Sequence, residues 1–145
     1  MSKNKSLITV QAIIDAPVEM VWKNWTSPSD IIKWNTASDD WHTTKAENDL
    51  RIGGKFLSRM EAKDGTVGFD FVGVYDNVKT NELIEYTLED DRKVKVSFTS
   101  ENGKTKVIET FEAESENSLE LQFGGWQAIL DNFKKYTEAS LVNMP

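Results

Sequence analysis

The chain holds few of the side chains that do acid–base, nucleophilic or metal chemistry near neutral pH. Its 145 residues include one histidine, His42, and no cysteine. An imidazole is a candidate general base because it titrates close to neutrality. His42, however, lies in Asp40-Trp41-His42-Thr43, without a second histidine, a cysteine or a serine motif nearby. The sequence therefore predicts no catalytic residue, no metal site and no cofactor.

A pair of carboxylates inside a cavity could also transfer protons. Three acidic residues fall within expected strands: Glu61, Asp70 and Glu85. Each is opposite in phase to its aromatic neighbours, so we expect all three to face solvent. Glu109 differs because it shares the phase of Val107 and Phe111, which predicts an inward side chain unless a strand end or a bulge exposes it. One inward carboxylate does not make a pair.

Asp49 and Arg51 form another charged candidate. Two residues apart on an extended segment, they would point to the same side and form an ion pair at a turn or a cavity rim. The Arg51 guanidinium could instead hold a ligand carboxylate through two hydrogen bonds. The ion pair is favoured because the adjacent Gly53-Gly54 indicates a demanding backbone geometry.

Aromatic residues outnumber these polar candidates, since the chain has seven Phe, five Trp and three Tyr residues. Aromatic rings bury a large apolar area and shape cavities, so this composition favours binding over catalysis. We predict that the following residues contact a bound ligand: Trp25, Trp34, Trp41, Phe56, Met60, Phe69, Phe71, Tyr75, Tyr86, Phe98, Trp126 and Leu130. Tyr75 and Tyr86 are the stronger candidates because a buried hydroxyl requires a hydrogen-bond partner. For each of these residues, a plain core role is the alternative.

Length and charge limit the function classes. At 145 residues the chain has the size of one domain, which we assign to residues 1–145. Its 17 basic and 24 acidic residues give a formal charge of −7, which repels phosphate backbones and anionic lipid surfaces. These numbers argue against nucleic acid and membrane surfaces as partners.

No segment has the pattern of a targeting signal or a membrane span. Thr9 and Gln11 interrupt the apolar residues near the N-terminus, so the h-region of a signal peptide is missing. No stretch approaches the roughly 20 apolar residues that a membrane span needs. The absence of cysteine fits a reducing compartment, and the expected location is the cytoplasm.

The elements that would position these side chains begin with a strand. Residues 7–14 alternate between apolar and polar positions, which predicts a half-buried strand. Residues 15–17 then indicate a helix start, and apolar residues recur at helical spacing over 18–25. A Ser-Pro pair ends this helix, and Ser29 is the expected N-cap of a second short helix that includes 31–34.

The middle of the chain has the pattern of strands separated by turns. We expect strands over 41–47 at a sheet edge and over 55–62, 66–76, 82–89, 93–99 and 105–113. Lys63-Asp64-Gly65 and Asn102-Gly103 are turn signals, and the second is typical of tight hairpins. Together these segments predict a run of antiparallel strands.

The last part of the chain changes to helical spacing. One apolar stripe predicts a long C-terminal helix: Leu119, Phe123, Trp126, Leu130, Phe133 and Tyr136. Gly124-Gly125 near its start weakens a helix, so we expect a close contact or a bend there. The element order predicts an α+β fold with helices on one face of an antiparallel sheet. A long twisted sheet can curl around the last helix and leave a cavity.

Segments spread over nearly the whole chain occur in an order and spacing typical of one protein family. The strongest run is Ala46-Glu47-Asn48-Asp49-Leu50-Arg51-Ile52-Gly53-Gly54-Lys55-Phe56. Further segments are Ala16-Pro17 to Val21-Trp22, Ser27-Pro28, Ile31 to Trp34, Phe71-Val72-Gly73-Val74-Tyr75, Glu82-Leu83-Ile84, Gly125-Trp126 and Ile129-Leu130. In these segments the chain resembles the domain shared by the Hsp90 ATPase activator homologues, within the START-like, or SRPBCC, superfamily.

The resemblance implies a helix-grip fold. In this fold a curved antiparallel sheet of six or seven strands wraps around a long C-terminal helix, with two short helices after the first strand and an apolar cavity open near them. The resemblance implies no particular reaction, because superfamily members carry lipids or plant hormones, cyclise polyketides or act as co-chaperones.

The expected partner is a small hydrophobic ligand, either aromatic or lipid-like, and the expected function is to bind it. Two alternatives stay open. One is a cyclase-like or hydrolase-like enzyme that uses the same cavity, in which Tyr75, Tyr86 or His42 transfers a proton. The other is a module that binds a chaperone. The chain resembles only the C-terminal domain of the eukaryotic activators, which argues against chaperone activation.

Overall fold

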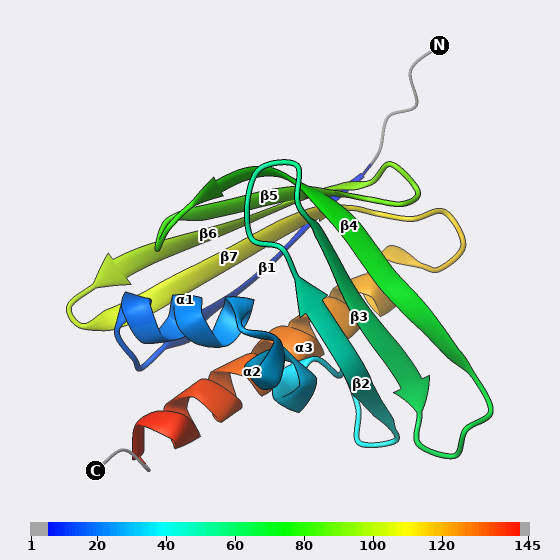
Figure 1. Ribbon diagram of the computed structural model, residues 1–145, viewed down its shortest axis with the longest axis horizontal. Coiled ribbons are helices and arrows are strands. Elements are labelled where there is room, and N and C mark those ends of the chain that lie inside the picture. Colours follow the sequence, from blue (N-terminus) through cyan, green and yellow to red (C-terminus); the bar gives the residue numbers. More distant parts are fainter. Residues whose placement is uncertain (1–5, 143–145) are drawn as a thin grey trace.

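A sheet and three helices that cover one of its faces make up the fold between residues 6 and 142 (Figure 1). The computed structural model describes these residues, and the first five and last three residues of the predicted domain lie outside them. In chain order, the described elements are β1 (Leu7–Ile14), α1 (Val18–Thr26), α2 (Pro28–Trp34), β2 (Trp41–Asn48), β3 (Lys55–Ala62), β4 (Gly68–Lys79), β5 (Leu83–Leu88), β6 (Lys93–Glu101), β7 (Lys104–Glu112) and α3 (Leu119–Val142).

The described strands form one seven-stranded antiparallel sheet in the order β1-β7-β6-β5-β4-β3-β2. Consecutive strands from β2 to β7 pair directly, and β1 pairs with β7. Successive side chains of a strand point to opposite faces of the sheet, and in β1 the buried face holds Ile8, Val10 and Ile14. Irregular pairing in β2 and β4 bends the sheet, which curls over α3 (Figure 1). The predicted α+β fold, with its curved sheet and long last helix, is confirmed.

Two short helices follow β1 as expected, with one correction to a boundary. Ser27, not Ser29, is the N-cap of α2: its backbone is extended, with φ −82° and ψ 124°, and Pro28 begins the helix. Proline suits the first helical turn and excludes the residue before it from the helix, which places the boundary at Ser27. The Trp34 indole donates a hydrogen bond to the Asn24 carbonyl oxygen at 2.9 Å, which fixes α2 against α1.

The long C-terminal helix is confirmed as α3, which packs against β1, α1 and α2. Its predicted apolar stripe is wrong at the start, where Leu119 and Phe123 are 52% and 45% exposed. The buried position there is Gln122, whose side-chain amide accepts a hydrogen bond from the Glu114 N–H and donates one to the Glu114 carbonyl oxygen. These bonds turn Gln122 inward and leave Leu119 and Phe123 at the edge of the buried face. Neither α3 nor another helix within residues 6–142 combines the length and apolar character of a membrane span.

The expectation of a close contact at Gly124-Gly125 is wrong. A Cβ atom added at either position would meet no heavy atom of a neighbouring segment within 4 Å. Helix α3 runs through both residues. Packing against another segment therefore does not require glycine at these positions.

A buried hydroxyl ties β7 to the segment that joins β1 to α1. Thr105 of β7 is fully buried, and its Oγ1 donates a hydrogen bond to the Ala16 carbonyl oxygen at 2.8 Å, just before α1. We expect Thr105→Val to lower the free energy of unfolding by about 1–3 kcal/mol, because the buried carbonyl loses its partner. Urea unfolding measures the loss, and Thr99→Val, at an exposed position of β6, is the control. Equal unfolding midpoints for the two variants would contradict this role of Thr105.

Candidate functional site

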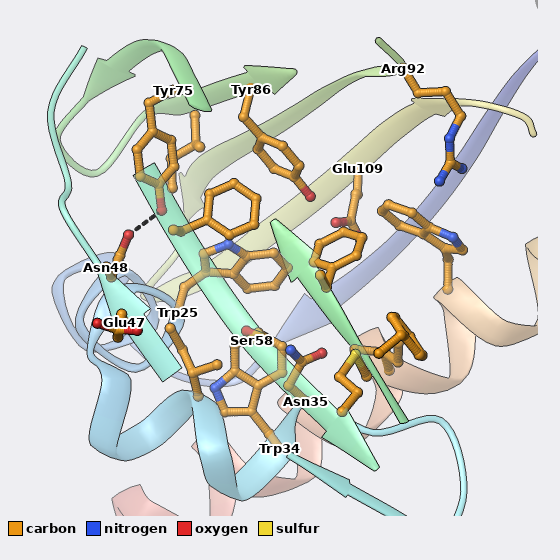
Figure 2. Close-up of a pocket in the computed structure, with 18 of the residues that line it drawn as sticks. Trp25, Trp34, Asn35, Glu47, Asn48, Ser58, Tyr75, Tyr86, Arg92 and Glu109 are labelled. Carbon is orange, nitrogen blue, oxygen red and sulfur yellow. Dashed lines mark hydrogen bonds between the residues drawn. The ribbon is translucent and has the colours of Figure 1, made fainter. Parts of the chain in front are cut away.

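A pocket of about 350 Å³ lies between α3 and the inner face of the sheet (Figure 2). Helix α3 packs mainly on β1 and on the short helices α1 and α2, at one side of the curved sheet. Side chains of β2, β3, β4, β5 and β7 line the pocket from the sheet, and side chains of α1, α2 and α3 line it from the helices. The pocket is therefore a consequence of how the sheet curls around the last helix.

Phe56 is the centre of the wall that the sheet provides. Its ring centroid lies 4.8 Å from that of Tyr86, 5.3 Å from that of Tyr75 and 5.9 Å from that of Phe71. The cross-strand partner of Phe56 on β4 is Gly73, and a Cβ atom there would lie 2.6 Å from atoms of the Phe56 ring. The glycine thus makes room for the ring on this wall.

The opposite wall is built on a cluster of Trp25, Trp34 and Phe133. The Phe133 centroid lies 4.8 Å from each tryptophan, and the two tryptophan centroids are 5.1 Å apart. Nearer the N-terminus of α3, Trp126 stacks on Phe111 of β7. The two ring centroids are 3.8 Å apart, and the angle between the ring planes is 11°. Aromatic pairs of this kind stabilise beyond their burial, so they hold the rings of this wall in place.

Nine of the twelve predicted ligand contacts line the pocket: Trp25, Trp34, Phe56, Met60, Phe69, Phe71, Tyr75, Tyr86 and Trp126. The other three lie outside its lining: Trp41, Phe98 and Leu130. Phe98 packs in the core with its centroid 5.3 Å from that of Trp22, and Leu130 is fully buried. Trp41 begins the edge strand β2, where its ring contacts Phe69 at 6.0 Å. Contact between the nine lining residues and a ligand stays a prediction.

Tyr75 is held at the pocket wall by hydrogen bonds at both its ends. Its hydroxyl donates to Oδ1 of Asn48, as the dashed line in Figure 2 marks, and Nδ2 of Asn48 donates to the Thr26 carbonyl oxygen at 2.6 Å. The Tyr75 backbone exchanges hydrogen bonds of 2.8 and 2.9 Å with the turn at Gly53-Gly54. Gly53 has φ +83°, and a Cβ atom at Gly54 would lie 2.0 Å from a carbonyl oxygen, so the expected demanding geometry is confirmed.

Glu109 of β7 and Tyr86 of β5 present polar groups at another part of the pocket. Glu109 is only 6% exposed, and its predicted inward phase is confirmed by the buried Val107 and Phe111. Burial raises the pKa of Glu109 to about 8. The pKa of Tyr86 is raised well above its ordinary value, mainly by burial and then by the nearby Glu109. Figure 2 shows the Tyr86 hydroxyl pointing toward the Glu109 carboxyl. Glu109 therefore carries a proton at neutral pH that it can donate.

Sequence reasoning missed the polar residues of the pocket lining other than the two tyrosines, and among them are Asn48, Arg92 and Glu109. The phase of Glu109 on its strand indicated an inward side chain but not that a cavity lay beside it. Asn48 ends β2 and Arg92 lies between β5 and β6, where no periodicity predicts the direction of a side chain. These two could be placed only once the register of the sheet was known.

The remaining charged candidates lie outside the pocket lining. His42 is exposed on β2. Asp49 and Arg51 form the expected ion pair, with Nε of Arg51 3.0 Å from Oδ2 of Asp49 and both side chains exposed. None of the three strand carboxylates expected to face solvent lines the pocket: Glu61, Asp70 and Glu85. Within residues 6–142, no group of three or more His, Cys, Asp or Glu side chains could hold a metal ion.

Known structures share this fold over nearly their whole length. The solution structure of an AHSA1-like protein from Aeromonas hydrophila is 44% identical to this chain, with 97% of each chain covered and a TM-score of 0.89. A protein of Cytophaga hutchinsonii with a solution structure is 51% identical, with 99% of this chain and 98% of that chain covered and a TM-score of 0.80. A crystal structure from Nitrosomonas europaea, at 17% identity, covers 94% of this chain and 96% of its own with a TM-score of 0.80, which shows the fold alone.

One family model matches most of the chain. Its description is "Activator of Hsp90 ATPase homolog 1-like protein", and the match runs over residues 15–138, from the end of β1 into α3. A comparison with curated proteins finds no match. The segment matched contains the strands and helices that build the pocket, and the chain therefore belongs to the family of Activator of Hsp90 ATPase homolog 1-like proteins.

Proposed function

We propose that this protein binds a small apolar molecule, aromatic or lipid-like, in the pocket between α3 and the sheet. The observation that supports the proposal is a pocket of about 350 Å³ with mainly apolar walls, to which eight aromatic side chains contribute. Ligand pockets commonly have volumes of about 300–1,000 Å³, apolar walls and a few polar groups that orient the ligand. We also propose a cytoplasmic location, on the absence of cysteine.

The pocket wall offers an apolar ligand both ring surface and polar groups that can orient it. Phe56 on the sheet and Trp126 on α3 offer ring surface to an apolar ligand, and packing against other rings holds each of them. The Tyr75–Asn48 hydrogen bond and the Glu109 carboxyl supply the polar groups. Proteins with this family's fold commonly bind ligands, which agrees with the proposal.

A second candidate function is a cyclase-like or hydrolase-like reaction in the same pocket. The observation that favours it is the approach of two titratable groups, Glu109 and Tyr86, inside an apolar cavity. A protonated Glu109 would be the general acid, and the walls would hold the substrate in a reactive conformation. Mass spectrometry of a ligand recovered after incubation separates the two functions, because a carrier returns its ligand unchanged.

The proposed binding predicts that a ligand stabilises the fold and that a filled pocket abolishes the effect. Thermal unfolding with flavonoids, fatty acids and polyketide-like aromatics should reveal a ligand class that raises the melting temperature, since ligand at 100 times Kd adds about 2.7 kcal/mol. Ser58→Phe places a ring in the pocket from β3 and should remove that increase. Ser97→Phe, on the outer face of β6, is the matched control and should keep it. A panel without any stabilising ligand would contradict the proposal.

A further inference from the structure

We propose that the pocket selects neutral ligands with a hydrogen-bond-accepting oxygen, such as a ketone, and that Tyr86 and Glu109 donate the hydrogen bonds to it. This inference rests on the proposed binding function and adds the chemical class of the ligand.

The register of the sheet places the two residues on its inner face, on either side of strand β6. Tyr86 of β5 lies opposite Val94 of β6, and Val94 lies opposite Phe111 of β7. Glu109 is two residues from Phe111 on the same strand and therefore shares its inner face. Figure 2 shows the two polar ends directed toward one another inside the pocket. One ligand oxygen can thus approach both groups.

Neither polar group has a hydrogen-bond partner within residues 6–142. The Glu109 carboxyl and the Tyr86 hydroxyl make no hydrogen bond there, although the two residues are 6% and 8% exposed. The hydroxyls of the other two tyrosines donate to Asn48 and to Asp30. Among the same residues, no unpartnered polar side-chain atom is completely enclosed, so the free atoms of Tyr86 and Glu109 open onto the pocket. Buried polar groups normally have a hydrogen-bond partner, and a ligand atom in the pocket would supply one for Tyr86 and Glu109.

The charges around the pocket favour a neutral acceptor over an ion. Besides Tyr75, the titratable and charged groups that line the pocket with this pair are Glu47, Arg92 and Glu114. The positive charge of Arg92 acts on Tyr86 and repels an ammonium group there, and Asp90 already pairs with Arg92 at 2.7 Å. The two other carboxylates of the lining repel an anion. A neutral oxygen also enters without the desolvation cost of a charge.

The protonation state of Glu109 makes it a donor in the neutral range. Burial raises the pKa of Glu109 to about 8, so below that pH its carboxyl carries the proton that an acceptor oxygen needs. Above about pH 8 the carboxylate repels the same oxygen. The preference for a ketone should therefore weaken as the pH rises past this value.

Four naphthalene probes of similar size test the inference: 2-acetylnaphthalene, 2-ethylnaphthalene, 2-naphthoate and 1-(2-naphthyl)ethylamine. Quenching of tryptophan fluorescence at pH 6.5 gives the affinity of each for the full chain. We expect the ketone to bind about tenfold more tightly than the hydrocarbon, as one or two net hydrogen bonds allow. The naphthoate and the amine should bind more weakly than the ketone.

Variants of the two donors complete the test. Tyr86→Phe and Glu109→Leu should reduce the preference for the ketone to about twofold or less. Glu109→Gln keeps an N–H donor and should keep the preference while losing its pH dependence. Glu101→Gln, at the exposed end of β6, should behave as the wild type.

The outcomes separate this inference from the binding function on which it rests. If 2-ethylnaphthalene binds and the ketone binds no better, or if the amine or the naphthoate binds most tightly, the oxygen-acceptor inference is wrong and the binding function stands. If none of the four probes binds, the oxygen-acceptor inference is wrong, and the thermal-unfolding panel decides whether the binding function stands. A preference for the ketone that survives in both Tyr86→Phe and Glu109→Leu would also overturn the assignment of these donors.

Discussion

Replacing Glu109 with glutamine is expected to stabilise the fold at alkaline pH by at most ~5 kcal/mol, the gap between a pKa of about 8 in the folded chain and the ordinary value of 4.5. Between these two values the folded chain keeps a proton that the unfolded chain has released, so the stability of the wild type falls as the pH rises. Glutamine has a similar shape and no such proton. Its advantage should therefore be small near pH 4.5, grow through neutrality and level off above about pH 8.

Urea unfolding of both proteins between pH 5 and pH 9 measures this effect. Glu101→Gln removes an exposed carboxylate on the neighbouring strand β6 and is the matched control, for which we expect a change within about 0.5 kcal/mol. A wild type and a Glu109→Gln variant with parallel stability curves would show that Glu109 ionises freely in the folded chain. The buried, unpartnered position of the carboxyl would then have no energetic consequence.

Truncating Phe133 to alanine is expected to lower the free energy of unfolding by about 3–5 kcal/mol. Its ring has no exposed surface and lies 4.8 Å from the rings of both Trp25 and Trp34, so it joins α3 to α1 and α2. Removing it leaves a cavity that these indoles cannot fill without leaving the pocket wall. Guanidinium unfolding followed by tryptophan fluorescence reports both the stability and the altered environment of the indoles.

The control for this substitution lies on the same helix. Phe123→Ala removes the same atoms from a side chain that is 45% exposed, and its cost should be much smaller than that of Phe133→Ala. Similar losses for both variants would mean that burial against the tryptophans does not set the cost. A large loss in Phe133→Ala alone would tie stability to the wall of the pocket.

Most of the fold could be predicted because its signals are local. Strand alternation and turn residues such as Asn102-Gly103 depend on neighbours in the chain, and the strands formed close to the predicted segments. The errors occur where two local signals compete or a distant group intervenes. Pro28 outweighed Ser29 in setting the start of α2, and hydrogen bonds between Gln122 and the preceding loop turned Phe123 outward.

The site was less accessible to sequence reasoning than the fold. Residue type and strand phase placed Phe56, Tyr75 and Tyr86 on the inner face, but they do not distinguish solid core from cavity wall. Phe98 and Leu130 are also apolar and were predicted to contact a ligand, but they lie in the packed interior. The distinction depends on the distance between α3 and each strand. That distance follows from the curl of the whole sheet and not from any one segment.

The pairing of β1 with β7 has a consequence for the order in which the fold can form. Leu7 lies opposite Glu112 and Ile14 opposite Thr105, so the first strand to leave the ribosome has the last one as its sheet neighbour. Helix α3, which packs on β1, is synthesised later still. The hairpins from β2 to β6 can form while synthesis continues, but β1 has to wait until β7 has been synthesised. Closing so long a loop costs entropy and slows folding, so we expect the pairing of β1 with β7 to be a late step in folding.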